Sequence, residues 1–155
     1  MINLPDVAEL VPHQAPMILI DKLLAVDEST VHCQVFITTD SQFFEQKSNS
    51  VGAWVGIEYM AQTVSAWSGY QSFLNNEVPP IGFLLGCRRY QTESDCFHDG
   101  DVLDVYAEQL MESDGMSAFS CLIKCNGIVL ASAQLNAFVP NELQLEDMLK
   151  GNGND

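Results

Sequence analysis

Basic side chains are scarce in this sequence. The 155 residues include 6 Lys and Arg against 21 Asp and Glu, which gives a formal net charge of −15. This excess of negative charge disfavours binding to nucleic acid or to anionic membrane surfaces. It also disfavours docking of a large acidic partner, unless a local basic patch exists. Arg88–Arg89 is the only adjacent basic pair.

Cysteine motifs are missing as well. The five cysteines are an odd number, and no two of them have Cys-x-x-Cys spacing. Cys121 and Cys125 fall in an apolar, strand-like run, which predicts ordinary buried thiols rather than a zinc site. We therefore expect no metal, and no motif suggests an organic cofactor.

The sequence also lacks a recognisable secretory signal. The N-terminus, MINLPDVAEL, has no basic region followed by an apolar core, so we expect a cytoplasmic protein. Residues 51–76 are apolar and long enough to span a bilayer. Glu58, Gln62 and three serines in this stretch argue against a transmembrane segment and favour a helix covered by protein.

This stretch is the element around which we expect the chain to be organised. Glu58 is its only charge between Val51 and Leu74, and apolar residues lie on all sides of a helical projection. That pattern predicts a helix buried on most faces, with N-cap candidates at residues 48–50. A buried ionisable group is costly unless it is paired or neutral, so Glu58 is the most informative residue of the chain.

The remaining sequence predicts strands joined by tight turns. Asp-, Asn- and Gly-containing turns separate runs of apolar or alternating residues. We expect a short helix at 4–11, strands at 17–26 and 30–38, a loop at 39–50, and strands at 81–92, 102–111, 116–124 and 128–139. Residues 1–140 form one domain, and 141–155 are an acidic peripheral tail with a possible short helix at 142–150.

This order of elements predicts an α+β hot-dog fold, a strongly curved antiparallel sheet wrapped around one long central helix. A single wrapped sheet leaves an unpaired edge and an open side. Such units normally dimerise, so we expect a homodimer or a heterodimer.

Three segments resemble the FabA/FabZ-type 3-hydroxyacyl-acyl-carrier-protein dehydratases, over roughly residues 8–139. Residues 11–21, VPHQAPMILID, resemble the family's LPHRYPFLLVD opening, and residues 86–101 resemble its "G…PGD" segment. Residues 57–62, IEYMAQ, resemble its IEAMAQ helix, and this register places Glu58 on the family's catalytic acid.

One departure from that family is as informative as the resemblance. The family's GHFPGxPxxPG loop carries the catalytic histidine, whereas residues 45–52 are shorter and contain neither histidine nor proline. VGAWVGIEYMAQ after a lost histidine loop is most similar to the ApeP-like dehydratases. That subfamily is associated with aryl polyene pigment clusters, beside a second, conventional dehydratase.

The resemblance implies dehydration of 3-hydroxyacyl thioesters, carried on the phosphopantetheine arm of an acyl carrier protein, to trans-2-enoyl thioesters. This reaction needs a base at C2, an acid at the C3 hydroxyl, and a donor at the thioester oxygen. Glu58 would be the acid, with burial keeping its proton in place. Gln62, one turn on, could hold that carboxyl or a water. A glutamate that merely binds backbone is the alternative.

Three histidines could replace the missing base. His13 lies in a proline-bracketed turn that borders the acyl tunnel in the family, and it is our candidate base; a structural histidine is the alternative. His32 alternates out of phase with the apolar face of its strand, and His98 lies in a turn, so we expect both at the surface. Glu58 acting alone through water is a further possibility.

The start of the helix offers candidate substrate contacts. The amides of Gly52 and Ala53 at its positive end suit a developing oxyanion, although an ordinary helix start is equally consistent with the sequence. We expect large apolar residues of the helix mainly in the core, with one or two lining a tunnel: Trp54 as a substrate contact, Tyr59, Met60 and Trp67.

Arg88 or Arg89 could bind the phosphopantetheine phosphate or a carrier protein. Alternation along a strand would send the two to opposite faces, so at most one is expected to do so, and solvated charge is the alternative. Two other functions stay open: a non-catalytic hot-dog subunit paired with an active dehydratase, and an acyl thioesterase that uses a carboxylate and water.

Overall fold

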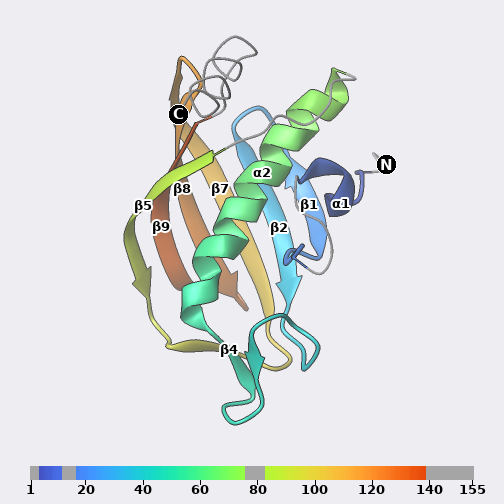
Figure 1. Cartoon of the computed structure of the whole chain (residues 1–155), viewed down its shortest axis with the longest axis vertical. Helices are drawn as coiled ribbons and strands as arrows, with labels where there is room; N and C mark the ends of the chain where they lie inside the picture. Colours follow the sequence, from blue (N-terminus) through green and yellow to red (C-terminus); the bar gives the residue numbers. More distant parts are fainter. Residues whose placement is uncertain (1–3, 12–16, 76–82, 139–155) are drawn as a thin grey trace, which may run out of the picture.

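The computed structural model describes residues 4–11, 17–75 and 83–138. A six-stranded antiparallel sheet curves around one long helix, α2 (Gly56–Leu74), which lies across its concave face (Figure 1). In spatial order the strands are β1 (Lys22–Val26), β2 (Thr30–Phe36), β7 (Val102–Ser113), β8 (Met116–Cys125), β9 (Ile128–Phe138) and β5 (Phe83–Thr92). This arrangement confirms the expected α+β fold.

Tight turns set the register of the central strands. The β7–β8 turn holds Asp114 at φ 53° and Gly115 at φ 84°, and the β8–β9 turn holds Asn126 at φ 53° and Gly127 at φ 80°. Two successive residues with positive φ are the mark of the turn whose twist suits a β-hairpin, and Asn, Asp and Gly adopt it at least cost. These predicted turns are therefore confirmed.

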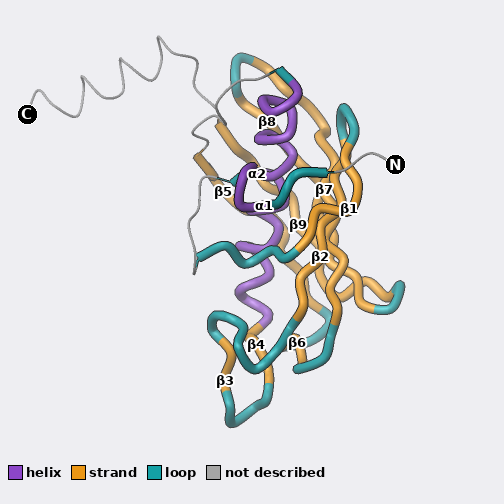
Figure 2. Tube along the Cα trace, turned by 90° about the vertical axis from the view of Figure 1, so that its right-hand side faces the viewer, coloured by secondary structure: helices purple, strands orange, loops and turns teal. Residues whose placement is uncertain are grey.

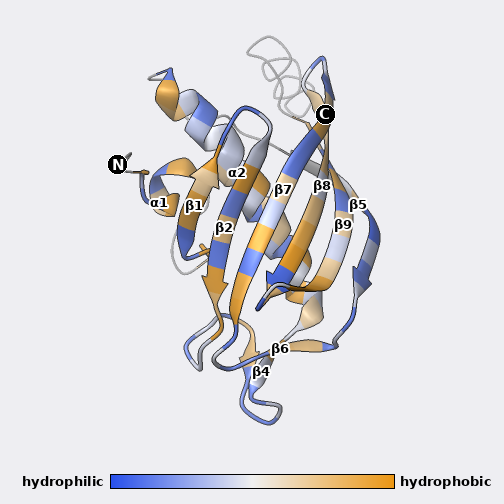
Figure 3. Ribbon diagram, turned by 180° about the vertical axis from the view of Figure 1, so that it is seen from behind, coloured by the Kyte–Doolittle hydropathy of each residue, from blue (hydrophilic) through white to orange (hydrophobic). Residues whose placement is uncertain are grey.

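The core lies between the concave face of the sheet and α2. Along β2 the buried residues are every second one, and Figure 3 shows hydrophilic and hydrophobic residues alternating along this strand. A short helix, α1 (Val7–Leu10), packs beside α2 at Gly69, where an added Cβ would overlap with the Leu10 carbonyl group. Glycine is thus required for this close approach.

A second, small sheet precedes α2 and was not predicted. It consists of β3 (Phe44–Glu45), β4 (Ser50–Gly52) and β6 (Cys96–His98), with β4 in the middle. A 3₁₀ turn, η1 (Ala53–Val55), follows β4, so the helix begins at Gly56 rather than near 51. The expected N-cap at 48–50 is wrong, because Ser50 pairs with His98 in this sheet and the observed N-cap, Val55, makes no side-chain cap.

The helix is less enclosed than the sequence predicted. Figure 2 shows the sheet on one side of α2 only, and Ile57, Ala61 and Ser65 stay half-buried. Within the described residues, none of the helices combines the length and apolar content that crossing a bilayer requires. The tail boundary at 140 and the helix expected at 142–150 fall outside the described residues.

Candidate active site

Glu58 lies in the first turn of α2, where it is half-buried. The side-chain amide of Gln62, one turn further along, donates a hydrogen bond of 3.0 Å from Nε2 to Glu58 Oε1. Residues four apart on a helix face each other, which is why the two side chains meet. The Gln62 amide therefore holds Glu58 Oε1 in a fixed position at the start of α2.

Gln62 also ties the helix to the segment before β1. Its side chain is fully buried; Oε1 accepts from the Leu19 N–H at 2.7 Å, and Nε2 donates to the Met17 carbonyl at 2.8 Å. These bonds replace strand pairing, so β1 begins at Lys22 rather than at residue 17 as predicted. Gln62 therefore fixes the Glu58 carboxyl group and the neighbouring backbone relative to each other.

Glu58 borders an apolar depression of about 590 Å³. The other residues lining it are Met17, Phe43, Trp54, Val55 and Ile57. The rings of Phe43 and Trp54 meet edge to face with centroids 5.3 Å apart, and Trp54 is 62% exposed. The depression is of a size that suits organic ligands. It places a carboxyl group at the rim of an apolar surface fit for an acyl chain.

The large residues of this region divide between core and depression. Tyr59 and Met60 are buried as predicted, and Trp67 packs edge to face on Phe119. Trp54 lies outside the core, with its ring against Gly52, where an added Cβ would come within 2.5 Å of its Nε1. Gly52 is therefore needed for the position of Trp54. Trp54 lines the depression, and its role as a substrate contact stays a prediction.

The backbone at the helix start is largely engaged within the protein. The Ala53 N–H donates to the Asp95 carbonyl at 2.9 Å, and the Tyr90 hydroxyl donates to the Ala53 carbonyl. Burial raises the pKa of Tyr90 to about 12, so this donor keeps its proton at neutral pH. An oxyanion-binding role for the Ala53 amide would thus require it to give up its bond to Asp95. Sequence reasoning did not identify Tyr90.

His32 lies on the outer face of the sheet. Its Nε2 is 2.7 Å from Asp104 Oδ1, and its ring stacks on Tyr106 at 4.2 Å between centroids. Its side chain is 23% exposed, so His32 lies at the surface as predicted, although Asp104 and Tyr106 partly cover it. The pKa of Asp104 is held below its ordinary value: burial, the largest influence, opposes this, and hydrogen bonds from His32 and Gln34 outweigh it.

The other two candidate bases are His98 and His13. His98 is exposed at the end of β6, as predicted, and its ring lies 3.8 Å from Cys96 Sγ. His13 lies outside the described residues. Neither His32 nor His98 lines the Glu58 depression. Across the described part of the chain, no group of three or more His, Cys, Asp or Glu side chains could hold a metal ion.

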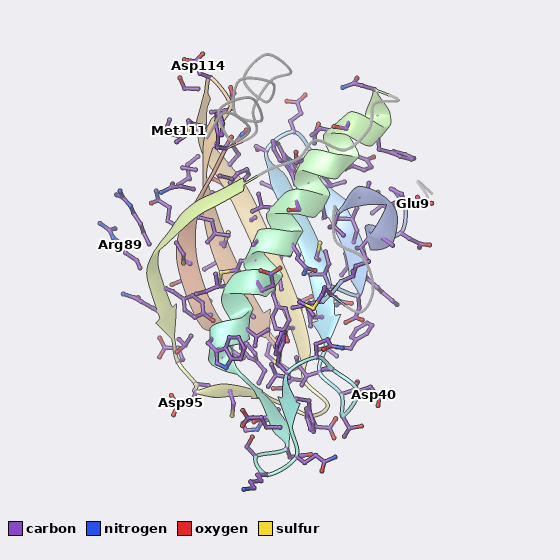
Figure 4. The ribbon with its side chains drawn as sticks, viewed as in Figure 1. Glu9, Asp40, Arg89, Asp95, Met111 and Asp114 are labelled. Carbon is purple, nitrogen blue, oxygen red and sulfur yellow. The ribbon has the colours of Figure 1, made fainter. Side chains whose placement is uncertain are left out.

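Arg88 and Arg89 lie on β5, the terminal strand of the large sheet. The pairing of β5 with β9 shifts register between Arg88 and Gln91, and Arg89 has φ 57°. This bulge interrupts the alternation along the strand, and both arginines are exposed; their placement on opposite faces stays a prediction. Figure 4 shows Arg89 directed away from the sheet.

Two residues of the depression were not singled out from the sequence. Phe43 adopts φ 68°, which is unusual for a bulky residue, and it is exposed beside Trp54. Met17 is also exposed, at 42%. The signal for Phe43 was its position as an apolar residue in a polar loop; Met17 carried no signal.

A curved sheet around one helix, with a single carboxyl group held at an apolar opening, defines a hot-dog protein with a carboxyl-based site. Solved structures agree: a Streptococcus pneumoniae hypothetical thioesterase with coenzyme A shares this fold at TM-score 0.59 and 11% identity, over 76% of this chain and 86% of that one. The structure titled "The Dehydratase Heterocomplex ApeI:P" from Xenorhabdus doucetiae is far more similar, with TM-score 0.86 and 31% identity over 95% and 99% of the two chains.

Sequence comparison points the same way. The curated 3-hydroxyacyl-[acyl-carrier-protein] dehydratase FabZ of Acinetobacter baylyi is 23% identical over 86% of this chain and 91% of its own length, and that of Bartonella quintana is 24% identical over 89% and 90%. A model of the ApeP-like dehydratases, described as ApeP dehydratase, matches residues 5–150. The chain belongs to the ApeP-like dehydratase family, which confirms the expectation of a dehydratase-type lyase.

Proposed function

We propose that this protein dehydrates 3-hydroxyacyl thioesters carried by acyl carrier protein to trans-2-enoyl thioesters, in fatty acid or aryl polyene-type biosynthesis in the cytoplasm. Membership of the ApeP-like family and the names of the FabZ relatives support the reaction and its carrier. The observation that carries the proposal is the Glu58 carboxyl group, held by Gln62 at the rim of an apolar depression.

In this reaction a base takes the proton from C2, and negative charge grows on the thioester oxygen. The C3–O bond then breaks, and Glu58 gives its proton to the departing hydroxyl group, which leaves as water. The C2–H electron pair becomes the new C2–C3 double bond. Gln62 supports this role because its side-chain amide holds the Glu58 carboxyl group in place through the bond to Oε1.

The base is His13 or a group from a second subunit. His32 is bound to Asp104 on the outer sheet face and His98 lines no part of the depression, so neither suits the role. The similar solved structure is titled a dehydratase heterocomplex, which supports pairing with a second dehydratase, and a homodimer is the alternative. Exposed Trp54 and Phe43 would be covered in such a pair.

Substrate contacts follow from this placement. Trp54 would line the acyl path, and Gly52 would let its ring lie close to the backbone. The Gly52 and Ala53 amides would steady the oxyanion only if the bond from Ala53 to Asp95 opens on binding. Arg88, exposed on β5, would meet the phosphate of the phosphopantetheine arm.

Glu58→Gln tests the proposal. Turnover of a 3-hydroxyacyl carrier substrate is measured with the protein alone and mixed with a conventional FabZ-type dehydratase whose own activity has been removed by mutation. We expect a loss of roughly 10²- to 10⁴-fold with an unchanged melting temperature, because an amide cannot act as the acid. Glu45→Gln, at an exposed glutamate of β3, is the matched control and should keep full turnover. Equal turnover by Glu58→Gln and wild type would remove Glu58 from the mechanism.

His13→Asn then identifies the base. If turnover falls as far as in Glu58→Gln, the base is His13; if it survives, the second subunit supplies the base. Release of free thiol without an enoyl product would instead select thioester hydrolysis. A further mixture uses an active second dehydratase; full turnover there with Glu58→Gln as good a partner as wild type, and none with the inactivated one, would identify a non-catalytic subunit.

A further inference from the structure

A second cavity, of about 360 Å³, shares no lining residue with the Glu58 depression. Ile18, Leu19 and Val35 form apolar walls, and Asp21 and Tyr59 contribute polar groups. The cavity lies where the segment before β1, the end of β2 and the first turns of α2 come together. The proposed chemistry does not use this cavity.

The Tyr59 hydroxyl group is the unusual feature of this cavity. The side chain is only 2% exposed, and no hydrogen bond joins its hydroxyl to any residue that the structure describes. Burial raises the pKa of Tyr59, and the negative charge of Asp21 raises it further, so the hydroxyl keeps its proton. A buried donor without a partner is costly and is uncommon in native proteins, which calls for an explanation.

The sequence makes the same position stand out. Tyr59 occupies the place of alanine in the IEAMAQ motif that residues 57–62 resemble. A methyl group at this position would leave the cavity larger and without a hydroxyl group. A phenol there costs desolvation and gives no internal hydrogen bond in return, and a molecule that enters the cavity and accepts from the hydroxyl group would offset this cost.

Asp21 supplies the complementary group. One of its oxygens, Oδ2, accepts from the Phe36 N–H at 2.7 Å, and the other makes no hydrogen bond to a described residue. Partial burial raises the pKa of this carboxyl group, and the nearby Asp40 adds further negative charge to the cavity. An anionic ligand is therefore disfavoured.

The two unused groups select a particular chemistry. The buried Tyr59 hydroxyl needs an acceptor, and the exposed Asp21 carboxyl group beside it can accept from a donor. A carbonyl group can only accept and an ammonium group can only donate, whereas a hydroxyl group does both with one oxygen atom. We propose that this cavity binds a neutral hydroxyl group, alcoholic or phenolic, on an apolar body that contacts Ile18, Leu19 and Val35.

Such a group has two sources, a free small molecule or the far end of an acyl chain. The first experiment uses 4-ethylphenol as the probe, with ethylbenzene and 4-ethylanisole as controls that lack the donor, and measures binding by ligand-observed NMR titration. We expect 4-ethylphenol to bind wild type best. Tyr59→Phe should weaken its binding roughly tenfold without lowering the melting temperature, because it removes an unpartnered hydroxyl.

Two further variants serve as a second test and a control. Asp21→Asn should also weaken binding of 4-ethylphenol. It replaces Tyr59→Phe as the test variant if Tyr59→Phe does not fold. Tyr70→Phe, at a half-buried tyrosine of the same helix that does not line the cavity, should leave binding unchanged. Equal binding of 4-ethylphenol and ethylbenzene, equal binding by wild type and Tyr59→Phe, or no binding at all would overturn the proposal and leave a solvated cavity only.

The second experiment distinguishes the sources and rests on the proposed function. Turnover of 3-hydroxyacyl thioesters that end in a hydroxyl or a methyl group is compared in wild type and Tyr59→Phe. If the preference in kcat/KM for the hydroxyl-ended chain falls in the variant, the acyl chain is the source; if the preference is unchanged, the ligand is a free molecule. A protein without dehydratase activity would fail only this second experiment, since the probe titration needs no turnover.

Discussion

Gln62 should stabilise the fold as well as hold Glu58. Gln62→Met removes its hydrogen bonds while keeping an unbranched side chain of similar size and good helix propensity. The variant leaves the Leu19 N–H, the Met17 carbonyl and Glu58 Oε1 each without this partner. Met17 and Glu58 line the proposed site, and Leu19 follows Met17 in the segment before β1.

The cost follows from where each group lies. Leu19 is buried, so its N–H cannot turn to water and loses about 1–3 kcal/mol. Met17 and Glu58 are partly accessible, so each contributes at most about 1 kcal/mol. The variant should therefore lose about 2–4 kcal/mol of unfolding free energy. For a domain of this size, that corresponds to a fall in Tm of about 10 °C.

Urea denaturation of the two proteins at neutral pH measures this loss. Gln71→Met is the matched control, because Gln71 lies on the same helix and donates one exposed bond of 3.2 Å to the Asp27 carbonyl. Trp67 Nε1 still donates a hydrogen bond of 3.1 Å to the Asp27 carbonyl, so the control should change the free energy of unfolding by less than about 0.5 kcal/mol. Equal stability of the two variants would refute the reasoning that Gln62 joins the 17–19 segment to the helix.

Two further predictions concern packing and pH. Gly69→Ala favours the helix by about 1 kcal/mol but forces a Cβ against the Leu10 carbonyl, so we expect a net loss of about 1–3 kcal/mol in thermal unfolding; a gain would show that α1 does not pack there. Asp104, whose folded pKa is lowered by His32 and Gln34, contributes stability above its unfolded pKa that is lost as pH falls through the folded pKa. Asp104→Asn should thus cost about 0.5–1 kcal/mol near pH 7 and almost nothing near pH 2, and a pH-independent difference would contradict this.

The hairpins and the helix were predictable because local sequence decides them. Asp114–Gly115 and Asn126–Gly127 can adopt the positive φ angles that the turns demand, and alternation along β2 and β7 shows which residues face the core. The small β3–β4–β6 sheet was missed because its strands are two or three residues long and because β4 and β6 pair residues about 45 apart. Strands this short carry no periodicity of their own.

The site was predictable in part. The motif at 57–62 pointed to Glu58, and the four-residue spacing pointed to Gln62, whose bond to Glu58 the structure shows. The hydrogen bonds that Gln62 makes to Met17 and Leu19 span more than 40 residues, and no local pattern indicates them.

The sequence by itself determined the architecture and the carboxyl group at its centre, because both depend on periodicity, turn residues and one charge in an apolar helix. Tertiary structure alone decided which groups surround that carboxyl group. The bulge at Arg89 in β5, the exposure of Trp54 and the bond from Ala53 to Asp95 all depend on contacts between distant strands. Such contacts follow from how the sheet curves around the helix, and no short stretch of the chain specifies that curvature.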